Sequence, residues 1–184
     1  MHYIEQYYNN TIKYELLNRF HYPKTKKIPK LEKIILNFGA KTFELKKLSV
    51  SLLALQIITK KKGTLTTSKK PNIILKIRKG NPVGCKVVLT KLRMYNFFEK
   101  LFTEVLPKLK KQTFVKNYPN KNSLTYNFEN TFIFKEVERN YLLFNTLKNL
   151  QICFLTGTET VEELFFLLNS LKIVAKMTKS LERM

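Results

Sequence analysis

Residues 69–93, KKPNIILKIRKGNPVGCKVVLTKLR, constrain the fold more than any other part of the sequence. Two short apolar runs rich in β-branched residues, 73–77 and 85–89, flank the turn-forming segment Gly-Asn-Pro-Val-Gly at 80–84. Such runs on either side of a turn predict a β-hairpin. Cations lead into and out of the turn, namely Lys76, Arg78, Lys79 and Lys86. Because glycines let a backbone approach closely, a basic hairpin of this kind is suited to a phosphate-bearing partner.

The net charge of +21, with a pI near 10.0, indicates a polyanionic partner. Between Glu44 and Glu99 the sequence contains thirteen Lys and Arg and no acidic residue, so this segment carries a strong positive potential. Nucleic acid is the polyanion that best explains such a charge, and an anionic membrane surface is the weaker alternative. No apolar run approaches the length of about 18 residues that a membrane span requires, so we expect none.

Apolar periodicity predicts both helices and strands along the chain. Residues that recur every three or four positions predict helices at 3–20, 43–58, 94–106 and 161–171. Further strands are predicted at 31–38, 64–67, 131–134 and 150–155. Thr160 and Glu163 have the spacing of a capping box at the start of the last helix. Residues 112–130 are rich in Asn and other polar residues, which predicts a long exposed loop.

The order of these elements favours an α+β fold. Helices and strands interleave without the strict βαβ order of a parallel sheet, so we expect a mostly antiparallel sheet with helices packed on one face. The other face and the loops would then bind RNA. We expect a single domain over residues 1–184, made of an N-terminal helix and basic hairpin region (1–107), a mobile loop (108–130), a C-terminal strand–helix part (131–172) and a basic tail (173–184).

The sequence offers no catalytic or metal-binding constellation. His2 and His21 are the only histidines, and neither has a cysteine or carboxylate at ligand spacing. Asp is absent, and no glycine-rich segment ends in the Gly-Lys-Ser or Gly-Lys-Thr of a phosphate-binding loop. Cys85 and Cys153 lie in apolar runs without a CxxC pair, so we expect two buried thiols rather than a disulfide or metal ligands. We therefore expect no enzymatic activity, no cofactor and no metal.

RNA binding is better supported by the same residues. Lys and Arg side chains every few positions would neutralise phosphates and give an affinity that falls steeply with salt, but such contacts do not specify sequence. Tyr and Phe among the cations are available to stack on unpaired bases. Two rival functions stay open: a free-standing basic RNA-binding module, such as a splicing or assembly factor, and an enzyme that acts on nucleic acid.

Two long motifs, in the correct order, resemble a family of ribosomal proteins. LKIRKGNPVGCKVVL, followed by Arg93-Met94-Tyr95 and Phe97-Phe98-Glu99, resembles the "large five" family of the large ribosomal subunit, and KIPKLEKIILNFGA at 27–40 resembles its first-strand motif. The resemblance implies an α+β fold and a location in the central protuberance. The implied partners are 5S rRNA or its equivalent, large-subunit rRNA, peptidyl-site tRNA and neighbouring ribosomal proteins, including a small-subunit head protein.

The resemblance implies two sets of contact residues. Asn37 matches a family position that hydrogen-bonds 5S rRNA, with a buried-turn role as the alternative. The full predicted RNA-binding set is Lys33, Asn37, Lys60, Lys61, Lys62, Lys86, Thr90 and Arg93. The alternative for Lys33 is a role at the strand entry, and the alternative for the lysines at 60–62 is to oppose the dipole of the preceding helix. The implied set that approaches tRNA is Lys69, Lys70, Arg78, Lys79 and Gly80. The chain departs from the family where Lys-Lys-Lys-Gly at 60–63 replaces a Gly-Gln-Lys-Pro turn, and where Val88 replaces a hydrogen-bonding side chain. These departures imply an electrostatic rather than a residue-specific contact with a divergent 5S rRNA.

Composition indicates where the protein is made. Lys, Asn, Ile, Phe and Tyr are abundant while Asp and Trp are absent, a bias that AT-rich coding produces. The N-terminal residues include Glu5 and Glu15 and lack the Arg- and Ser-rich, acid-free character of a transit peptide. We therefore expect synthesis inside an organelle, with the mitochondrion as the first expectation and a plastid as the alternative.

Overall fold

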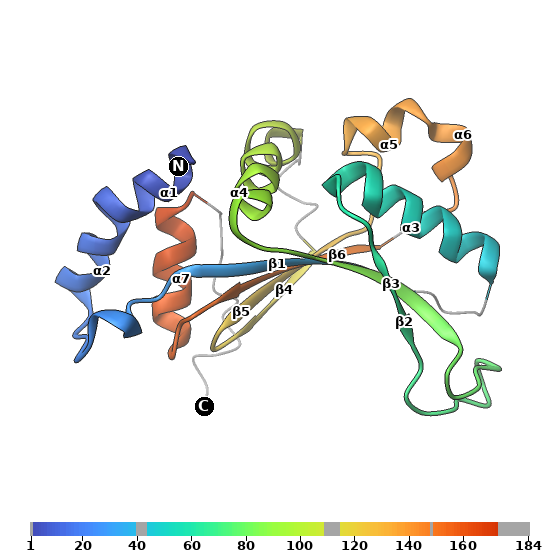
Figure 1. Cartoon of the computed structure of the whole chain (residues 1–184), viewed down its shortest axis with the longest axis horizontal. Helices are drawn as coiled ribbons and strands as arrows, with labels where there is room; N and C mark the ends of the chain where they lie inside the picture. The colour runs from blue at the N-terminus through green and yellow to red at the C-terminus, as the bar shows by residue number, and fades with distance from the viewer. Residues whose placement is uncertain (1, 40–43, 109–114, 148, 173–184) are drawn as a thin grey trace.

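The computed structural model describes residues 2–39, 44–108, 115–147 and 149–172, and it confirms an α+β fold (Figure 1). Six strands form one sheet in the order β2-β3-β1-β6-β5-β4, and every pairing between neighbours is antiparallel. The strands are β1 (Leu31–Gly39), β2 (Thr64–Thr67), β3 (Pro82–Leu89), β4 (Val115–Asn120), β5 (Ser123–Phe128) and β6 (Leu150–Thr156).

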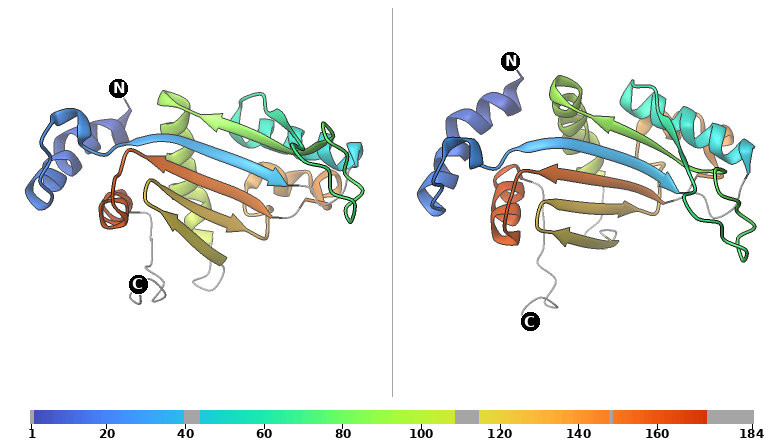
Figure 2. Two further views of the ribbon diagram at one scale, coloured as in Figure 1. Left: turned by 90° about the horizontal axis from the view of Figure 1, so that it is seen from below. Right: turned by 60° about the horizontal axis from the view of Figure 1, so that its bottom comes forward.

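The helices gather on one side and at one end of this sheet (Figures 1 and 2). The longer ones are α2 (Lys13–Arg19), α3 (Leu45–Thr59), α4 (Lys91–Lys100) and α7 (Val161–Ser170). The shorter ones are α1 (Tyr3–Tyr7), α5 (Lys135–Arg139) and α6 (Tyr141–Phe144). Two π-helical turns, η1 (Tyr8–Ile12) and η3 (Leu101–Val105), continue α1 and α4, and two 3₁₀ turns are η2 (Thr25–Lys27) and η4 (Leu106–Lys108). Figure 1 shows α3 to α6 on one side of the sheet, with α1, α2 and α7 at the end where β1 begins.

Period-two alternation in the central strands gives the sheet one buried face. In β1 the side chains of Ile34, Leu36 and Phe38 are buried, and in β6 those of Ile152 and Phe154 are buried. Alternate residues of a strand point to opposite faces, so these side chains share the helix-covered face. They join the helices in one hydrophobic core. None of the described helices covers the opposite face (Figure 2).

Several sequence predictions are confirmed by this arrangement. The helices predicted at 3–20, 43–58 and 161–171 and the strands predicted at 31–38, 64–67, 85–89 and 150–155 are present within a few residues. The capping box is formed, because the Thr160 hydroxyl accepts from the Glu163 backbone N–H and the Glu163 carboxylate accepts from the Thr160 backbone N–H. The third helix begins earlier than predicted, at Lys91. The predicted tail at 173–184 lies outside the described residues.

The prediction of a strand at residues 73–77 is wrong. The partner of β3 on this side is β2, which pairs from Thr64 opposite Lys86 to Thr67 opposite Pro82. Residues 73–76 form a turn closed by a bridge between Asn72 and Ile77, and the side chains of Ile73 and Ile74 are more than nine-tenths exposed. The hairpin therefore exists, but its first strand lies earlier in the sequence and residues 68–81 form its long tip.

The exposed loop predicted at 112–130 and the strand predicted at 131–134 are also wrong. Residues 115–128 contain the antiparallel pair β4 and β5, and Leu124, Tyr126 and Phe128 of β5 are buried against the helices. Residues 131–134 form a turn in which the Phe134 backbone N–H donates to the Thr131 carbonyl at 3.3 Å. This turn leads into α5 and α6, two helices that the apolar periodicity does not predict.

The expectation of two buried thiols is correct for one cysteine. Cys85 is buried, and burial raises the pKa of its thiol. Cys153 is only half-buried, because it alternates with the buried Ile152 and Phe154 and so lies on the face without helices.

Candidate nucleic-acid interface

The uncovered face of the sheet brings together predicted RNA-binding residues from two strands. Lys33 and Asn37 lie on this face in β1, and Lys86 lies on it in β3. Asn37 and Lys86 are direct cross-strand partners. We call this surface the open face; its other members include Thr64 of β2, Ile35 of β1, Val88 of β3, Thr125 and Asn127 of β5, and Gln151, Cys153 and Leu155 of β6.

A row of polar side chains crosses the open face at right angles to the strands. Register places Thr64 beside Lys86, Lys86 beside Asn37, Asn37 beside Gln151, and Gln151 beside Asn127. Neighbouring strands lie about 4.8 Å apart, so this polar row spans roughly 19 Å. It combines one ammonium group with three amides and a hydroxyl, which can bind phosphates and 2′-hydroxyls together.

One hydrogen bond within the row orients its central amide. Asn37 Nδ2 donates to Gln151 Oε1 at 3.3 Å. The Asn37 carbonyl oxygen is then left to accept from a ligand, and the Gln151 amide nitrogen is left to donate. Asn37 lies inside β1 and is half-buried, so the alternative of a buried-turn role is wrong.

Three further predicted residues lie near the same edge of β3. Thr90 is exposed and continues the alternation of Lys86 and Val88, and its hydroxyl makes no capping hydrogen bond to α4. The pairing of β2 with β3 ends at Lys86, so the carbonyl oxygen of Val88 has no partner in β2. Lys61 donates to this oxygen from Nζ at 2.6 Å. Lys61 therefore caps the sheet edge, while Lys62 beside it is exposed.

Lys60 and Arg93 lie elsewhere, in a polar pocket of about 460 Å³ among the helices. The pocket is lined from α3, α4 and α5, and Lys100 crosses it to bind Glu136 Oε1 at 2.5 Å. Burial acts to raise the pKa of Glu136, but hydrogen bonds from Lys100 and from its own backbone N–H, together with the charges of Lys100 and Arg139, outweigh burial and lower the pKa below its ordinary value. The structure therefore separates these two cations from the open face.

The predicted tRNA-contacting residues all lie in the tip of the β2–β3 hairpin, which we call the hairpin tip (residues 68–81). Lys69, Lys70, Arg78, Lys79 and Gly80 are all exposed there. The base of the tip is closed by hydrogen bonds from the Ser68 N–H to the Asn81 carbonyl and from the Gly80 N–H to the Ser68 carbonyl, each 2.9 Å. Gly80 has φ +90°, a conformation that side-chain-bearing residues rarely adopt. Figure 2 shows the tip projecting beyond the end of the sheet.

The predicted cations keep their charge available. Within the described ranges, none of the predicted Lys or Arg residues forms an ion pair with a carboxylate; the lysines that do are Lys27, Lys47, Lys100, Lys108 and Lys135. An unneutralised positive surface attracts a polyanion.

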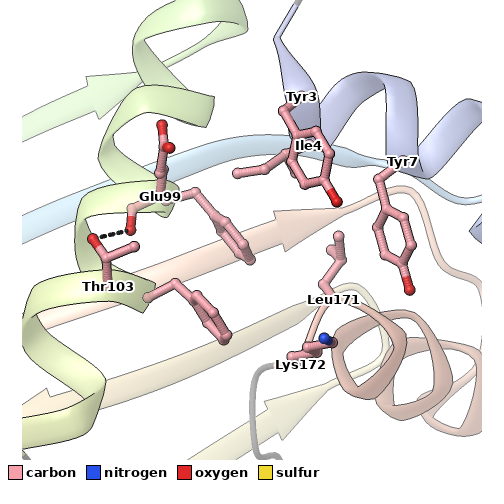
Figure 3. Close-up of a pocket in the computed structure, with 9 residues that line it drawn as sticks. Tyr3, Ile4, Tyr7, Glu99, Thr103, Leu171 and Lys172 are labelled. Atoms are coloured by element: carbon pink, nitrogen blue, oxygen red, sulfur yellow. Dashed lines mark hydrogen bonds between the residues drawn. The ribbon is translucent and has the colours of Figure 1, made fainter.

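A second pocket lies on the helical side of the sheet (Figure 3). It has a volume of about 260 Å³ and lies between α1, α4 with η3, and the C-terminal end of α7. Aromatic and aliphatic side chains form most of its lining, with Glu99 as the carboxylate that borders it, and Thr103 donates to the Glu99 carbonyl at 2.9 Å. Nothing among its described lining residues resembles a nucleophile with an adjacent base.

Neither a metal-binding cluster nor a membrane-spanning helix occurs among the described residues. No three His, Cys, Asp or Glu side chains in this part of the chain lie close enough together to hold a metal ion. Each helix that the structure describes is too short or too polar to cross a membrane.

Comparison with known proteins identifies the family. A model of the C-terminal part of the ribosomal L5 protein family matches residues 82–174. The large ribosomal subunit protein uL5m of Reclinomonas americana is 32% identical over 180 residues, which cover 94% of this chain and 97% of the relative. The chain belongs to the uL5 family. The uL5 protein of Malacoplasma penetrans is 31% identical to this chain, over 94% of this chain and 93% of the relative. The uL5 protein of Clostridium acetobutylicum is 32% identical, over 87% of this chain and 90% of the relative.

Membership of the uL5 family confirms the predicted ribosomal resemblance and the absence of an enzymatic role, because these are structural proteins of the large ribosomal subunit. The open face adds Gln151 and Asn127 to the candidate residues, which the sequence reasoning missed. A signal for Gln151 was present: it alternates with Leu150 and Ile152 in a predicted strand, which places it opposite the core.

Proposed function

We propose that this uL5-family protein binds 5S rRNA, or its structural equivalent, through the open face and thereby holds it in the central protuberance of the large ribosomal subunit. The observation that carries the proposal is the polar row, in which Lys86, Asn37 and Gln151 are adjacent across three strands. A twisted sheet without a helical cover offers RNA a broad surface, and ammonium and amide groups on it match phosphates and 2′-hydroxyls.

The hairpin tip has a different role in this proposal. The tip projects beyond the end of the sheet, and in this proposal its exposed Lys and Arg side chains contact tRNA in the peptidyl site. Two hydrogen bonds close its base, so the cations are presented on an ordered projection rather than on a free chain. Further contacts in the proposal are large-subunit rRNA and neighbouring ribosomal proteins, including one of the small-subunit head.

The proposed location is the mitochondrial ribosome. The relative from Reclinomonas americana carries the name uL5m, which supports a mitochondrial protein, as does the coding bias of the sequence. A plastid ribosome is the alternative.

The test is crosslinking of RNA to this protein in a native organelle lysate, followed by a wash at raised salt and sequencing of the bound RNA. We expect 5S rRNA or its equivalent, with crosslinked peptides that contain Asn37, Lys86 or Gln151. Recovery of diverse messenger or intron RNA would refute the ribosomal assignment and favour a free-standing RNA-binding factor. Loss of sedimentation with the large subunit in moderate salt would also contradict the proposal.

A further inference from the structure

A basic groove lies at the N-terminal end of β1, separate from the residues assigned above. It has a volume of about 380 Å³ and lies between the π-helical turn η1 with α2 on one side and the segment 25–30 on the other. Lys13, Lys26 and Lys30 line it, together with the polar side chains of Asn9 and Thr25. We call these three lysines the groove lysines.

The groove lysines have no competing internal partner that the structure shows. In the described part of the chain, no carboxylate forms an ion pair with any of them, and no acidic residue lines the groove. The adjacent Lys27, by contrast, is paired with Glu159 at 3.0 Å. Three like charges facing one concave space repel one another, so their placement is unfavourable unless an anion enters.

The walls of the groove are held in place by a specific contact. The Tyr8 hydroxyl donates to the Pro29 carbonyl at 2.9 Å, which ties η1 to the residues that lead into β1. Burial, with a smaller contribution from Tyr95, raises the pKa of Tyr8 to about 12, so this donor keeps its proton at neutral pH. The π-helical turn that contributes Tyr8 and Asn9 is a second sign of function, because such turns are rare and frequently occur at functional sites.

We infer that this groove is a second RNA-binding site, in which the groove lysines bind backbone phosphates and Asn9 and Thr25 bind phosphate or ribose oxygens. The inference rests on the proposed RNA-binding function and extends its footprint. Phosphate is the ligand class that three ammonium groups without a carboxylate select, and RNA supplies phosphates in series.

The position of the groove indicates what a second site would add to RNA binding. It lies just before Leu31, whereas the hairpin tip lies near the other end of β1, where Gly39 pairs with Gly84. The nine residues of β1 are joined by eight steps of about 3.3 Å each, which separate the two ends by roughly 26 Å. An RNA lying along the open face would thus be held at both ends of β1, which fixes its direction on the sheet as well as its affinity.

The test compares the salt dependence of RNA binding by full-length variants, with a fluorescein-labelled 5S rRNA transcript as the probe. The groove variant is K13Q/K26Q/K30Q. The matched control, K46Q/K121Q/K172Q, removes the same charge from exposed lysines that form no ion pair with another described residue. A sheet variant, K33Q/K86Q, tests the open face separately. Surface substitutions of this kind have little effect on stability, so all three variants should fold.

The expected result is that the slope of log K against log salt becomes shallower by about 1 for each phosphate that the variant no longer binds, hence by up to about 3 for the groove variant. The control should change the slope by much less. A groove variant that behaves like the control would overturn the inference. If the sheet variant loses affinity while the groove variant behaves like the control, RNA binding by the open face is supported and the groove is not an RNA-binding site. If only the groove variant loses affinity, the groove is supported as an RNA-binding site and the role of the open face is refuted.

Lysine acetylation on the wild-type protein gives an independent readout that needs no substitution. Bound RNA should protect Lys13, Lys26 and Lys30 from the reagent, while Lys46 should be modified at the same rate with and without RNA. Equal modification of the groove lysines in both states would contradict the inference.

Discussion

Replacing Lys100 by Met should destabilise the fold by removing the ion pair that joins α4 to α5. Lys100 donates from Nζ to Glu136 Oε1 at 2.5 Å and to the Ile58 carbonyl at 3.2 Å. The second contact satisfies one of the last carbonyls of α3, where a cation also opposes the helix dipole. The other carboxylate oxygen of Glu136 is buried without a hydrogen-bond partner, so K100M would leave the carboxylate with only its own backbone N–H and the charge of Arg139 to stabilise it.

The magnitude follows from how deeply the pair is buried. Breaking a fully buried pair by removing one partner costs about 3–5 kcal/mol. The side chains of Lys100 and Glu136 are 18% and 30% exposed, so solvent screens part of this loss. We expect K100M to lower the free energy of unfolding by about 2–3 kcal/mol, which moves the urea midpoint by roughly 1 M for a typical denaturant dependence.

The loss should depend on pH in a defined direction. The pKa of Glu136 in the folded protein is below its ordinary 4.5, so the stabilisation is present above pH 4.5 and disappears as the pH falls through the lower, folded value. In K100M the cation that lowers this pKa is gone. The difference in unfolding free energy between wild type and K100M should therefore be greatest near pH 7 and should shrink as the pH falls below 4.5.

The matched control is K108M. Lys108 pairs with Glu138 at 3.5 Å, but the two side chains are 40% and 63% exposed, so this substitution should cost only about 0–1 kcal/mol. Urea unfolding followed by circular dichroism at pH 7 and pH 3.5 measures both variants. A loss in K100M no larger than that in K108M, or one that is the same at both pH values, would refute the reasoning.

Three further predictions test the sheet and its interface. Gln151→Leu removes the hydrogen bond to Asn37, so RNA affinity in fluorescence anisotropy should fall about 3–10-fold without loss of stability; unchanged affinity would exclude β6 from the interface. Gly84→Ala would place a Cβ 2.7 Å from the Phe38 carbonyl oxygen, so urea unfolding should show a loss of about 1–3 kcal/mol, and wild-type stability would contradict the close packing of β1 and β3. Thr160→Ala removes the capping hydroxyl of α7 and should cost about 1 kcal/mol in the same assay, where no change would show that the capping box is unimportant.

The success of the sequence predictions depends on how strongly periodicity marks each element. β1 and β6 alternate apolar residues in the core with other residues on the open face, and α7 begins with a recognisable capping box, so their types and positions are predictable. β5 alternates in the same way through Leu124, Tyr126 and Phe128. Its polar neighbours obscure the pattern, because a segment rich in Asn has the composition of a loop.

The misplaced strand has a different physical cause. Ile73 and Ile74 have strong strand propensity, yet β3 already has an edge partner in β2 and the intervening tip turns back on itself through Asn72 and Ile77. Tertiary pairing thus overrides local propensity. The same limit applies to the candidate site: Lys60 and Arg93 are predicted RNA-binding residues, but the helices carry them to a pocket away from the open face.

The central position of β1 has a consequence for how the chain folds. β1 pairs with β3 on one side and with β6 on the other, so Phe38 must find Leu150, more than a hundred residues later in the chain. During synthesis, β1 can pair with β3 early, but its second edge stays unpaired until β6 emerges. Such distant pairing slows folding, and an apolar strand edge waiting for its partner invites association with other chains. A nascent chain that ends before Leu150 should therefore need a chaperone, or the charge of bound RNA, to stay dispersed.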